Sequence, residues 1–354
     1  MHDATHTPTA TRHSDDPRAL PTITDALRLR MIVGGDVMLG RAVARRVHTR
    51  GVRYPLGSIA PYARAADVRI ANLECPITSA SQTWRGAPKA FYFRAPPRAI
   101  DCLTAVGIDL VSLANNHALD YGVAGLTDTL SALDCAGIAH AGAGIDLDAA
   151  LAPAVVERRG VRIGMTAFCD HQPDYAAGPG RPGIAHLDLA DRGRALRTLQ
   201  TALAAQRERG VHWPVLSLHW GPNWAERPAP ALIALAHAAI DMGWRMVYGH
   251  GAHIFQGIEI HRGAAILYGA GDLVDDYAVH PTLRNDRQVL YDLLLGPDGL
   301  ERLTLHPLVI EAFRTRLADE VSREWIAARM RERSALFGTT ITGEDPLTVS
   351  LARH

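Results

Sequence analysis

The sequence of 354 residues lacks four features that assign many chains to a class at once. It has no apolar run long enough to span a bilayer and no signal-peptide core near its start, so we expect a soluble, cytoplasmic protein. Its 37 basic and 37 acidic residues cancel, which predicts no general attraction to nucleic acid or to an anionic membrane. Its four cysteines show no CxxC spacing, which favours buried thiols in a reducing compartment.

The remaining composition is typical of a globular protein with a sizeable core. Hydrophobic residues make up 47% of the chain and charged residues 21%. Residues 1–24 are polar, with Thr, His, Asp and Pro, and we expect a flexible tail there. Residues 25–354 are expected to form one catalytic domain, with a C-terminal helix and strand at about 311–354 packed on it.

Short apolar runs alternate with segments of helical spacing along most of the chain. This alternation favours an α/β fold with a largely parallel sheet, and hairpin patterns predict that the sheet is mixed or doubled. We expect a hairpin over residues 254–273. Strands are expected at 27–33, 67–72, 108–114, 212–221 and 244–251, and helices at 98–107, 123–137, 189–210, 229–243 and 319–338.

Polar side chains that bind metals or protons follow six of the apolar runs. In α/β sheets the carboxyl ends of strands are where ligands bind, so residues at these ends should converge on one site. These residues are Asp36, Asn72, Glu74, Asn115, Asn116, His117, Asp120, His219, His250, His253 and Asp272.

Each of these residues also has an ordinary structural explanation. Asp36 could cap the helix that follows it, the pair Asn115 and Asn116 could form a turn, and a lone histidine is often a hydrogen-bonded loop residue. Because all six apolar runs end in side chains that can bind a metal or a proton, separate structural explanations do not account for the whole set. The pattern therefore predicts a single site assembled from many loops.

Several of these stretches together resemble a known family. They are "GGDVMLGR" (34–41), "ANLECPIT" (71–78), "FYFRAPP" (91–97), "SLANNHALDYG" (112–122), "GHGAH" followed by "FQGIE" (249–259) and "ILYGAGDLV" (266–274). The chain is similar over residues 29–278 to the CapA-type proteins, the poly-γ-glutamate synthesis branch of the calcineurin-like metallophosphoesterase superfamily. The resemblance implies a four-layer αββα sandwich with mixed sheets and a metal site at one edge.

The resemblance also implies roles for particular residues. Met38 stands where phosphoesterases have a second histidine ligand, so one divalent ion, similar to Ca, Mn or Mg, is expected and no organic cofactor. The metal ligands would be Glu74, Asn116, His219, His250 and Asp272. The resemblance implies that His117 handles a proton. Transfer of a proton at a Cα needs two acid–base groups, which could be His117 with Asp120 and His250 or His253 with Asp36 or Asp272, so the catalytic candidates are His117, Asp120, His253 and Asp36.

A histidine-rich and carboxylate-rich pocket around one ion suits proton transfer. Soluble members similar to this chain include epimerases of lasso-peptide precursors, so we expect a metal-dependent peptide epimerase acting at the Cα of a C-terminal residue. The alternatives are a phosphoester hydrolase, a soluble poly-γ-glutamate biosynthesis factor and a non-enzymatic peptide-binding module. The expected partner is a precursor peptide, with neither nucleic acid nor membrane, and the oligomeric state stays open.

Aromatic and cationic residues near these motifs are candidates for binding a peptide end. An arginine would pair with a terminal carboxylate, and tryptophans beside a metal ligand would contact an aromatic residue. The alternative is that the tryptophans pack in the core or at the rim of the site. The candidates are Arg41, Trp84, Arg85, Lys89, Trp220 and Trp224.

Overall fold

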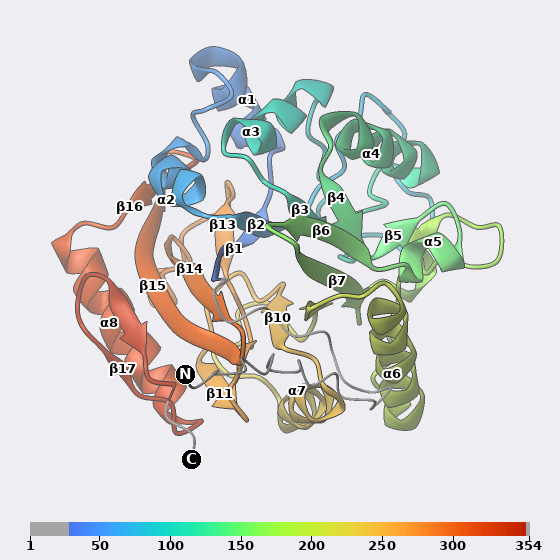
Figure 1. The fold of residues 1–354 in the computed structure, drawn as a ribbon. Helices are drawn as coiled ribbons and strands as arrows, with labels where there is room; N and C mark the ends of the chain where they lie inside the picture. The colour runs from blue at the N-terminus through green and yellow to red at the C-terminus, as the bar shows by residue number, and fades with distance from the viewer. Residues whose placement is uncertain (1–27, 352–354) are drawn as a thin grey trace, which may run out of the picture.

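The computed structural model describes residues 28–351, so the expected tail over 1–24 lies outside the described residues. Two sheets pack face to face, and helices cover the outer side of each (Figure 1). Both sheets combine parallel and antiparallel pairs. The fold is therefore the mixed-sheet, four-layer αββα sandwich that the resemblance implied.

The first sheet contains ten strands and is centred on β1 (Leu29–Val37). β1 runs parallel to β2 on one side and antiparallel to β14 on the other, and its last residues pair in parallel with β13. The other strands of this sheet are β2 (Val68–Leu73), β3 (Leu110–Ser112), β4 (Ala139–Ala141), β13 (Asp272–Val274), β14 (Arg287–Gly296), β15 (Gly299–Glu311), β16 (Arg314–Leu317), β17 (Ile341–Thr342) and β18 (Leu347–Val349).

The second sheet contains six strands in the order β11-β12-β10-β9-β7-β6. Its four inner strands run parallel, and the two edge strands are antiparallel to their neighbours. The strands are β6 (Ala154–Arg158), β7 (Val161–Cys169), β9 (Trp213–His219), β10 (Met246–His250), β11 (Ile258–His261) and β12 (Ala264–Leu267). A separate pair is formed by β5 (Ala143–Gly144) and β8 (Gly183–Ile184).

Two of the longer helices begin at a capping aspartate. Asp191 accepts a hydrogen bond from the backbone N–H of Arg194 at the start of α6 (Arg192–Glu208), and Asp319 accepts one from the backbone N–H of Ser322 at the start of α8 (Glu320–Ala335). No helix of residues 28–351 combines the length and the apolarity that crossing a membrane requires. The helices are α1 (Arg41–Arg50), α2 (Ala60–Ala65), α3 (Ile100–Ala105), α4 (Gly122–Ala136), α5 (Leu147–Leu151), α6 (Arg192–Glu208), α7 (Pro230–Met242) and α8 (Glu320–Ala335), with short 3₁₀ turns η1 (Gly57–Ile59), η2 (Pro97–Ala99) and η3 (Pro173–Tyr175).

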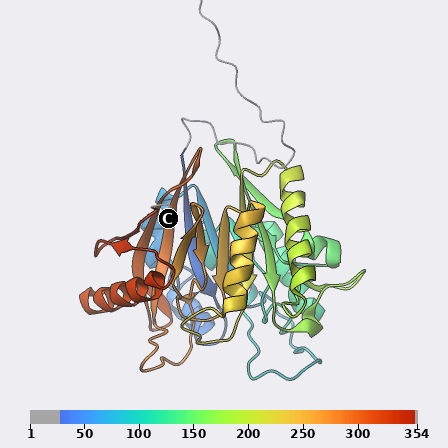
Figure 2. The same ribbon diagram turned by 90° about the horizontal axis from the view of Figure 1, so that it is seen from below.

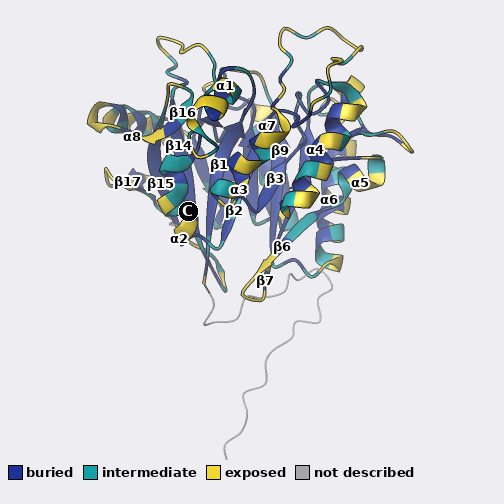
Figure 3. Ribbon diagram, turned by 90° about the horizontal axis from the view of Figure 1, so that it is seen from above, coloured by how far each residue is buried: buried dark blue, intermediate teal, exposed yellow. Residues whose placement is uncertain are grey.

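The second sheet is apolar on both faces because both faces are covered. On β9, Val215 points into the core between the sheets, whereas Leu216 points into a second core under α6 and α7. β10 alternates in the same way, with Met246 inward and Val247 outward. Figure 2 shows α6 and α7 lying against this sheet, and Figure 3 shows its strands buried and the helices exposed on one side.

The segment 254–273, which was expected to form one hairpin, contributes strands to both sheets. Only β11 and β12 form a hairpin, and the chain then crosses to the first sheet, where β13 pairs with β1. The crossing needs small residues, since a Cβ on Gly35 would lie 2.0 Å from the carbonyl oxygen of Gly271. This close approach places Asp272 directly beside Asp36.

Candidate metal centre

The first sheet contributes buried carboxylates from three neighbouring strands. Asp36 on β1 pairs in parallel register with Asp272 on β13 and with Asn72 on β2, and Glu74 directly follows β2. The side-chain amide of Asn72 donates to Asp36 Oδ1 at 2.8 Å. Asp36 is not a helix cap, because α1 begins after Gly40, and its side chain faces the other carboxylates instead.

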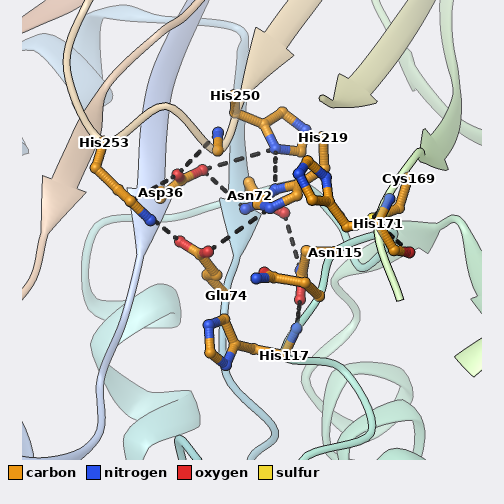
Figure 4. A network of polar contacts seen from close by, with 12 residues as sticks. Asp36, Asn72, Glu74, Asn115, His117, Cys169, His171, His219, His250 and His253 are labelled. Carbon is orange, nitrogen blue, oxygen red and sulfur yellow. Dashed lines mark hydrogen bonds and ion pairs between the residues drawn. The ribbon is translucent and has the colours of Figure 1, made fainter. Parts of the chain in front are cut away.

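The second sheet contributes histidines to the same place. His219 ends β9 and His250 ends β10, in register, with their Nδ1 atoms 3.0 Å apart. His253 follows in the loop after β10 with φ at 60°, and its Nδ1 lies 3.1 Å from Asp272 Oδ1. These side chains, all nearly inaccessible to solvent, converge from separate strands (Figure 4). The site therefore lies where the carboxyl ends of both sheets meet.

Asp36 joins two groups of potential metal ligands. One group is Asp36, His219 and His250, and the other is Asp36, Glu74, His253 and Asp272. The Asp36 oxygens face different groups, since Oδ1 lies 3.7 Å from His250 Nδ1 and Oδ2 lies 3.6 Å from His253 Nδ1. A carboxylate placed in this way is the bridge that two-metal sites use, so the donors offer more than the single ion expected from the sequence.

Several buried oxygens of this centre are left without a hydrogen-bond donor. Within residues 28–351, both carboxylate oxygens of Glu74, Asp272 Oδ2 and Asn116 Oδ1 have no hydrogen-bond partner. Burial raises the pKa of Glu74 and of Asp272 well above the ordinary range, and the nearby charge of Asp36 raises both further. Unpaired oxygens and crowded acids are what a bound cation would satisfy, so the residues fit a divalent ion.

Asn115 and Asn116, the paired asparagines of "SLANNHALDYG", have different surroundings. The amide of Asn115 donates to Asn72 Oδ1 and to the Leu73 carbonyl, and its Oδ1 accepts from the backbone N–H of His117. Asn115 therefore links the ends of β2 and β3. Asn116 keeps its side-chain oxygen unpaired among the described residues, which is compatible with the ligand role that the resemblance implied.

His117 forms a second functional group beside the centre. Its Nδ1 lies 2.6 Å from Asp120 Oδ2, and its ring stacks on Phe93 with centroids 3.9 Å apart. Lys89 Nζ donates to Asp120 Oδ1 at 2.5 Å and also to the carbonyl of Asn116. Burial lowers the pKa of His117 to about 4 despite the opposing effect of Asp120, so the ring is neutral at physiological pH.

The neutral ring has a defined tautomer. An ionised carboxylate can only accept a hydrogen bond, so the contact of Asp120 Oδ2 with Nδ1 assigns the proton of the neutral ring to Nδ1 and leaves Nε2 as the basic nitrogen. Burial also lowers the pKa of Lys89, whose charge Asp120 partly compensates. The group formed by His117, Asp120 and Lys89 can therefore exchange a proton beside the metal centre.

Met38 is fully buried, and its sulfur accepts the backbone N–H of Gly40 at 3.1 Å. A thioether is a poor ligand for ions that carboxylates bind, so this position supplies no donor to the centre. The absence of a histidine here leaves the group of Asp36, His219 and His250 with three protein donors.

The residues expected to bind a peptide end fall into different places. Lys89 lies inside the site, and Trp84 lies at its rim, where Nε1 donates to Asp174 and the ring meets Tyr175 edge to face. Arg85 is exposed on the same loop and contacts Gln82.

Arg41 does not present a free guanidinium, because it pairs with Asp276 and stacks over Phe93. Trp224 is half-buried beside His280, in the loop that follows β9. Trp220 is packed in the core under α6 and α7, and its Nε1 donates to the carbonyl of Tyr268. This packing favours the alternative that Trp220 is a core residue, and its expected contact with substrate stays a prediction.

Asp170 and His171, next to the centre, were missed by the sequence analysis. They follow β7, their side chains form an ion pair, and the ring of His171 lies edge-on to His219 at 5.9 Å. The rule applied to other strand ends would have found them, because "IGMTAF" is followed by "CDH". Asp275 was also missed, and its pKa is raised by burial and by Asp272.

Residues 30–277 match a family described as bacterial capsule synthesis protein PGA_cap. A probable polyglutamine synthesis accessory protein of Mycobacterium tuberculosis is 35% identical over 355 residues, covering 88% of this chain and 92% of that protein. The capsule biosynthesis protein CapA of Bacillus anthracis is 27% identical over 290 residues, covering 80% of this chain and 68% of that protein.

One of the similar solved structures is that of a hypothetical protein from Thermus thermophilus. It has a TM-score of 0.49 and 15% sequence identity, and the match covers 80% of this chain and 100% of that chain. The names of the two relatives concern polymer and capsule synthesis, and neither name concerns peptide epimerisation.

Proposed function

Because this chain belongs to the bacterial capsule synthesis protein family PGA_cap, we propose that it is a metal-dependent enzyme acting on poly-γ-glutamate during the synthesis of that polymer. This is the alternative that the sequence analysis left open beside peptide epimerisation. The names of the relatives favour it over the epimerase interpretation.

One observation carries the proposal of an enzyme. Buried carboxylate oxygens without hydrogen-bond partners among residues 28–351 lie beside a histidine whose tautomer is set by a carboxylate. A protein that only held a polymer would gain nothing from burying unpaired acids, because each one costs free energy of folding. Such an arrangement is typical of sites where a metal ion and a proton-transfer group act on the same substrate.

The two groups joined by Asp36 would hold the ion or ions. Three imidazoles among the donors favour a transition ion such as Mn²⁺, Fe²⁺ or Zn²⁺ over Ca²⁺ or Mg²⁺, which prefer oxygen ligands alone. When bound, the ion would act as a Lewis acid that polarises a carbonyl oxygen of the substrate.

In the proposed reaction on poly-γ-glutamate, His117 would accept a proton from the reacting groups at the polarised carbonyl. Its neutral ring can accept a proton at Nε2, and Asp120 would stabilise the imidazolium that forms. Lys89 holds the second oxygen of Asp120, so the carboxylate cannot rotate away from the ring. Removing a positioned acid–base group of this kind lowers rates by about 10²- to 10⁴-fold.

A surface groove lies close in sequence and space to Asp120 of this group. It is lined by residues 80–86 and 121–124, next to Asp120, whose carbonyl accepts the backbone N–H of Trp84. Arg85 lies in the groove and is exposed, and Arg94 stacks on Tyr121 from the same loop region. Cationic side chains along such a groove suit a chain of carboxylates. Figure 2 shows the loop after β2 and the loop after β13 leaving the same edge of the molecule.

The test is incubation of the purified full chain with poly-γ-glutamate of defined length, with Mn²⁺ or Zn²⁺ and after chelation. We expect a metal-dependent change in polymer length, measured by mass spectrometry, and no change for α-linked polyglutamate. His117→Ala should keep its metal content and lose the activity. The matched control is His140→Ala, because His140 is also paired with an aspartate, Asp134, at 3.1 Å but lies on edge strand β4.

The same incubation in D₂O separates the alternatives. Deuterium at Cα with unchanged polymer length would favour epimerisation, for which His117 and Lys89, both in contact with Asp120, offer two proton-carrying groups. Turnover of a nitrophenyl phosphate that depends on His117 would favour a phosphoester hydrolase. If neither length nor deuterium content changes and no phosphate is released, the proposal of an enzyme acting on this polymer fails.

A further inference from the structure

A second cluster of metal-binding side chains lies outside the centre, between α7 and the edge strand β11. His237 and Asp241 are four residues apart on α7, and Glu259 and His261 are two residues apart on β11. Both spacings place a pair on one face of its element. We propose that these four residues form a zinc site that ties α7 to β11.

The ligand atoms are already close together. One atom each from His237, Glu259 and His261 lie within 4.8 Å of one another. His237 Nε2 is 2.9 Å from Glu259 Oε1, and His261 Nε2 is 3.0 Å from Asp241 Oδ1. The two imidazole rings are stacked, with centroids 4.2 Å apart and planes 5° from parallel. The two histidine–carboxylate pairs therefore lie side by side.

Within each histidine–carboxylate pair, the separation is close to that of neighbouring donors in a tetrahedral zinc site. With zinc–ligand distances of about 2.0 to 2.1 Å, neighbouring donors lie roughly 3.3 Å apart. Each pair therefore has to open by a few tenths of an ångström. The side chains of His237 and Asp241 are 34% and 43% exposed, so they have room to adjust and the ion can enter from solvent.

Neighbouring groups orient the ligands and compete with the ion. Tyr268 donates to Glu259 Oε2 at 2.6 Å, which leaves Oε1 directed at His237. Such an outer hydrogen bond is typical of metal-binding carboxylates. Arg262 pairs with Asp241 at 3.0 Å, but its side chain is 71% exposed and can turn into solvent when the ion binds.

The donor set selects the class of ion and the purpose of the site. Two imidazoles with two carboxylates suit zinc, whereas Ca²⁺ and Mg²⁺ prefer oxygen ligands alone. All four protein positions would be filled, which is the arrangement of a structural site. Because α7 covers the second sheet and β11 is its edge, the ion would hold the helix against that edge. None of the four residues belongs to the two groups joined by Asp36, so the inference is independent of the proposed function.

The experiment compares the full chain with the variant His237→Ala/His261→Ala. After dialysis against micromolar zinc and removal of free ion, elemental analysis should find one zinc fewer per chain in the variant. Zinc should also raise the melting temperature of the variant less than that of the wild type. His140→Ala is the matched control, because its histidine pairs with one aspartate and belongs to no three-residue donor group of residues 28–351.

A milder variant keeps the test valid if the double variant does not fold. His261→Gln retains a hydrogen-bonding side chain and should weaken zinc binding at this site at least tenfold. The proposal is overturned if His261→Gln binds zinc with wild-type stoichiometry and affinity, or if His140→Ala loses as much zinc as the double variant. It is equally overturned if wild-type protein fills the site only at millimolar zinc.

Discussion

Replacement of Glu74 by Gln should have opposite effects on the metal-free and the metal-bound protein. Glu74 is fully buried, and neither carboxylate oxygen has a hydrogen-bond partner in the described part of the chain. Burial, followed by the charges of Asp36 and Asp272, raises its pKa well above the ordinary 4.5. Without an ion the acid therefore opposes folding, and the neutral amide of Gln removes that charge.

The magnitude follows from the cost of an unpaired buried group. That cost is about 1 to 3 kcal/mol, and more when the group is charged. For 354 residues, an unfolding entropy of about 2.1 cal/mol/K per residue converts it to a melting temperature higher by roughly 1.5 to 4 °C for the metal-free variant. With an ion at 100 times the wild-type Kd, binding stabilises the wild type by about 2.7 kcal/mol. A variant that binds 100-fold more weakly gains only about 0.4 kcal/mol.

The pH dependence has a definite sign. A carboxyl group whose folded-state pKa is raised destabilises the fold as the pH rises above its unfolded value. The metal-free wild type should therefore lose stability above pH 4.5, and Glu74→Gln should lose less. The pKa of Asp272 is raised by burial and by Asp36, and this residue remains in the variant. The stability of metal-free Glu74→Gln should therefore still fall with rising pH, but less steeply than that of the wild type.

Calorimetric melting after chelation and after addition of Mn²⁺, from pH 5 to 8, measures these effects. Glu157→Gln is the matched control, because its side chain is 54% exposed and pairs with Arg162 at the surface. It should change neither the metal-free melting temperature nor the metal response by more than a degree or so. If the metal-free Glu74→Gln variant has a lower melting temperature than the metal-free wild type, then Glu74 does not destabilise the fold in the absence of an ion, and the reasoning is refuted.

Two further predictions concern other residues. His117→Ala should keep the metal and the fold but lower the rate of the proposed reaction on poly-γ-glutamate by about 10²- to 10⁴-fold, and Asp120→Asn should lower it less. Turnover measured together with elemental analysis tests this, and loss of metal in His117→Ala would contradict it. At Asp292, burial raises the pKa, but hydrogen bonds from His306 and Arg30 lower it by more, so the net pKa is below the ordinary value of 3.8. The stability that ionised Asp292 contributes to the fold is therefore present above pH 3.8 and is lost as the pH falls below it. Asp292→Asn should therefore cost about 1 to 2 kcal/mol at pH 7 and flatten the acid limb of the melting curve between pH 2 and 4, and unchanged stability at pH 7 would contradict it.

The strand ends could be predicted from sequence because strand direction and burial leave a local signal. An apolar run followed by polar residues identifies Asp36, Glu74, His219 and His250 without knowledge of the strand order. The distinction between Trp220 and Trp224 is not local. Trp220 packs in the second core, where the carbonyl of Tyr268, 48 residues later, accepts its N–H, and no spacing in the sequence predicts that contact.

The path of the chain after β12 could not be predicted for a similar reason. "ILYGAGDLV" has the pattern of a strand followed by a turn, and such a pattern predicts a hairpin with the neighbouring segment of the chain. The structure instead sends Asp272 to the other sheet, where it pairs with Asp36, 236 positions earlier. The close backbone approach at Gly35 permits this pairing, and that approach is a property of two distant segments together.

The division of the centre between two sheets has a consequence for the order in which a newly made chain can acquire its ion. The carboxylates Asp36 and Glu74 emerge from the ribosome first, and the imidazoles of His219 and His250 follow more than a hundred residues later. A nascent chain that has completed only its first strands thus presents acids without the nitrogen donors that select a transition ion. Capture of an ion by the complete donor set would therefore have to wait until Asp272 has crossed back to β1. Bound metal would then mark the chains that have finished folding.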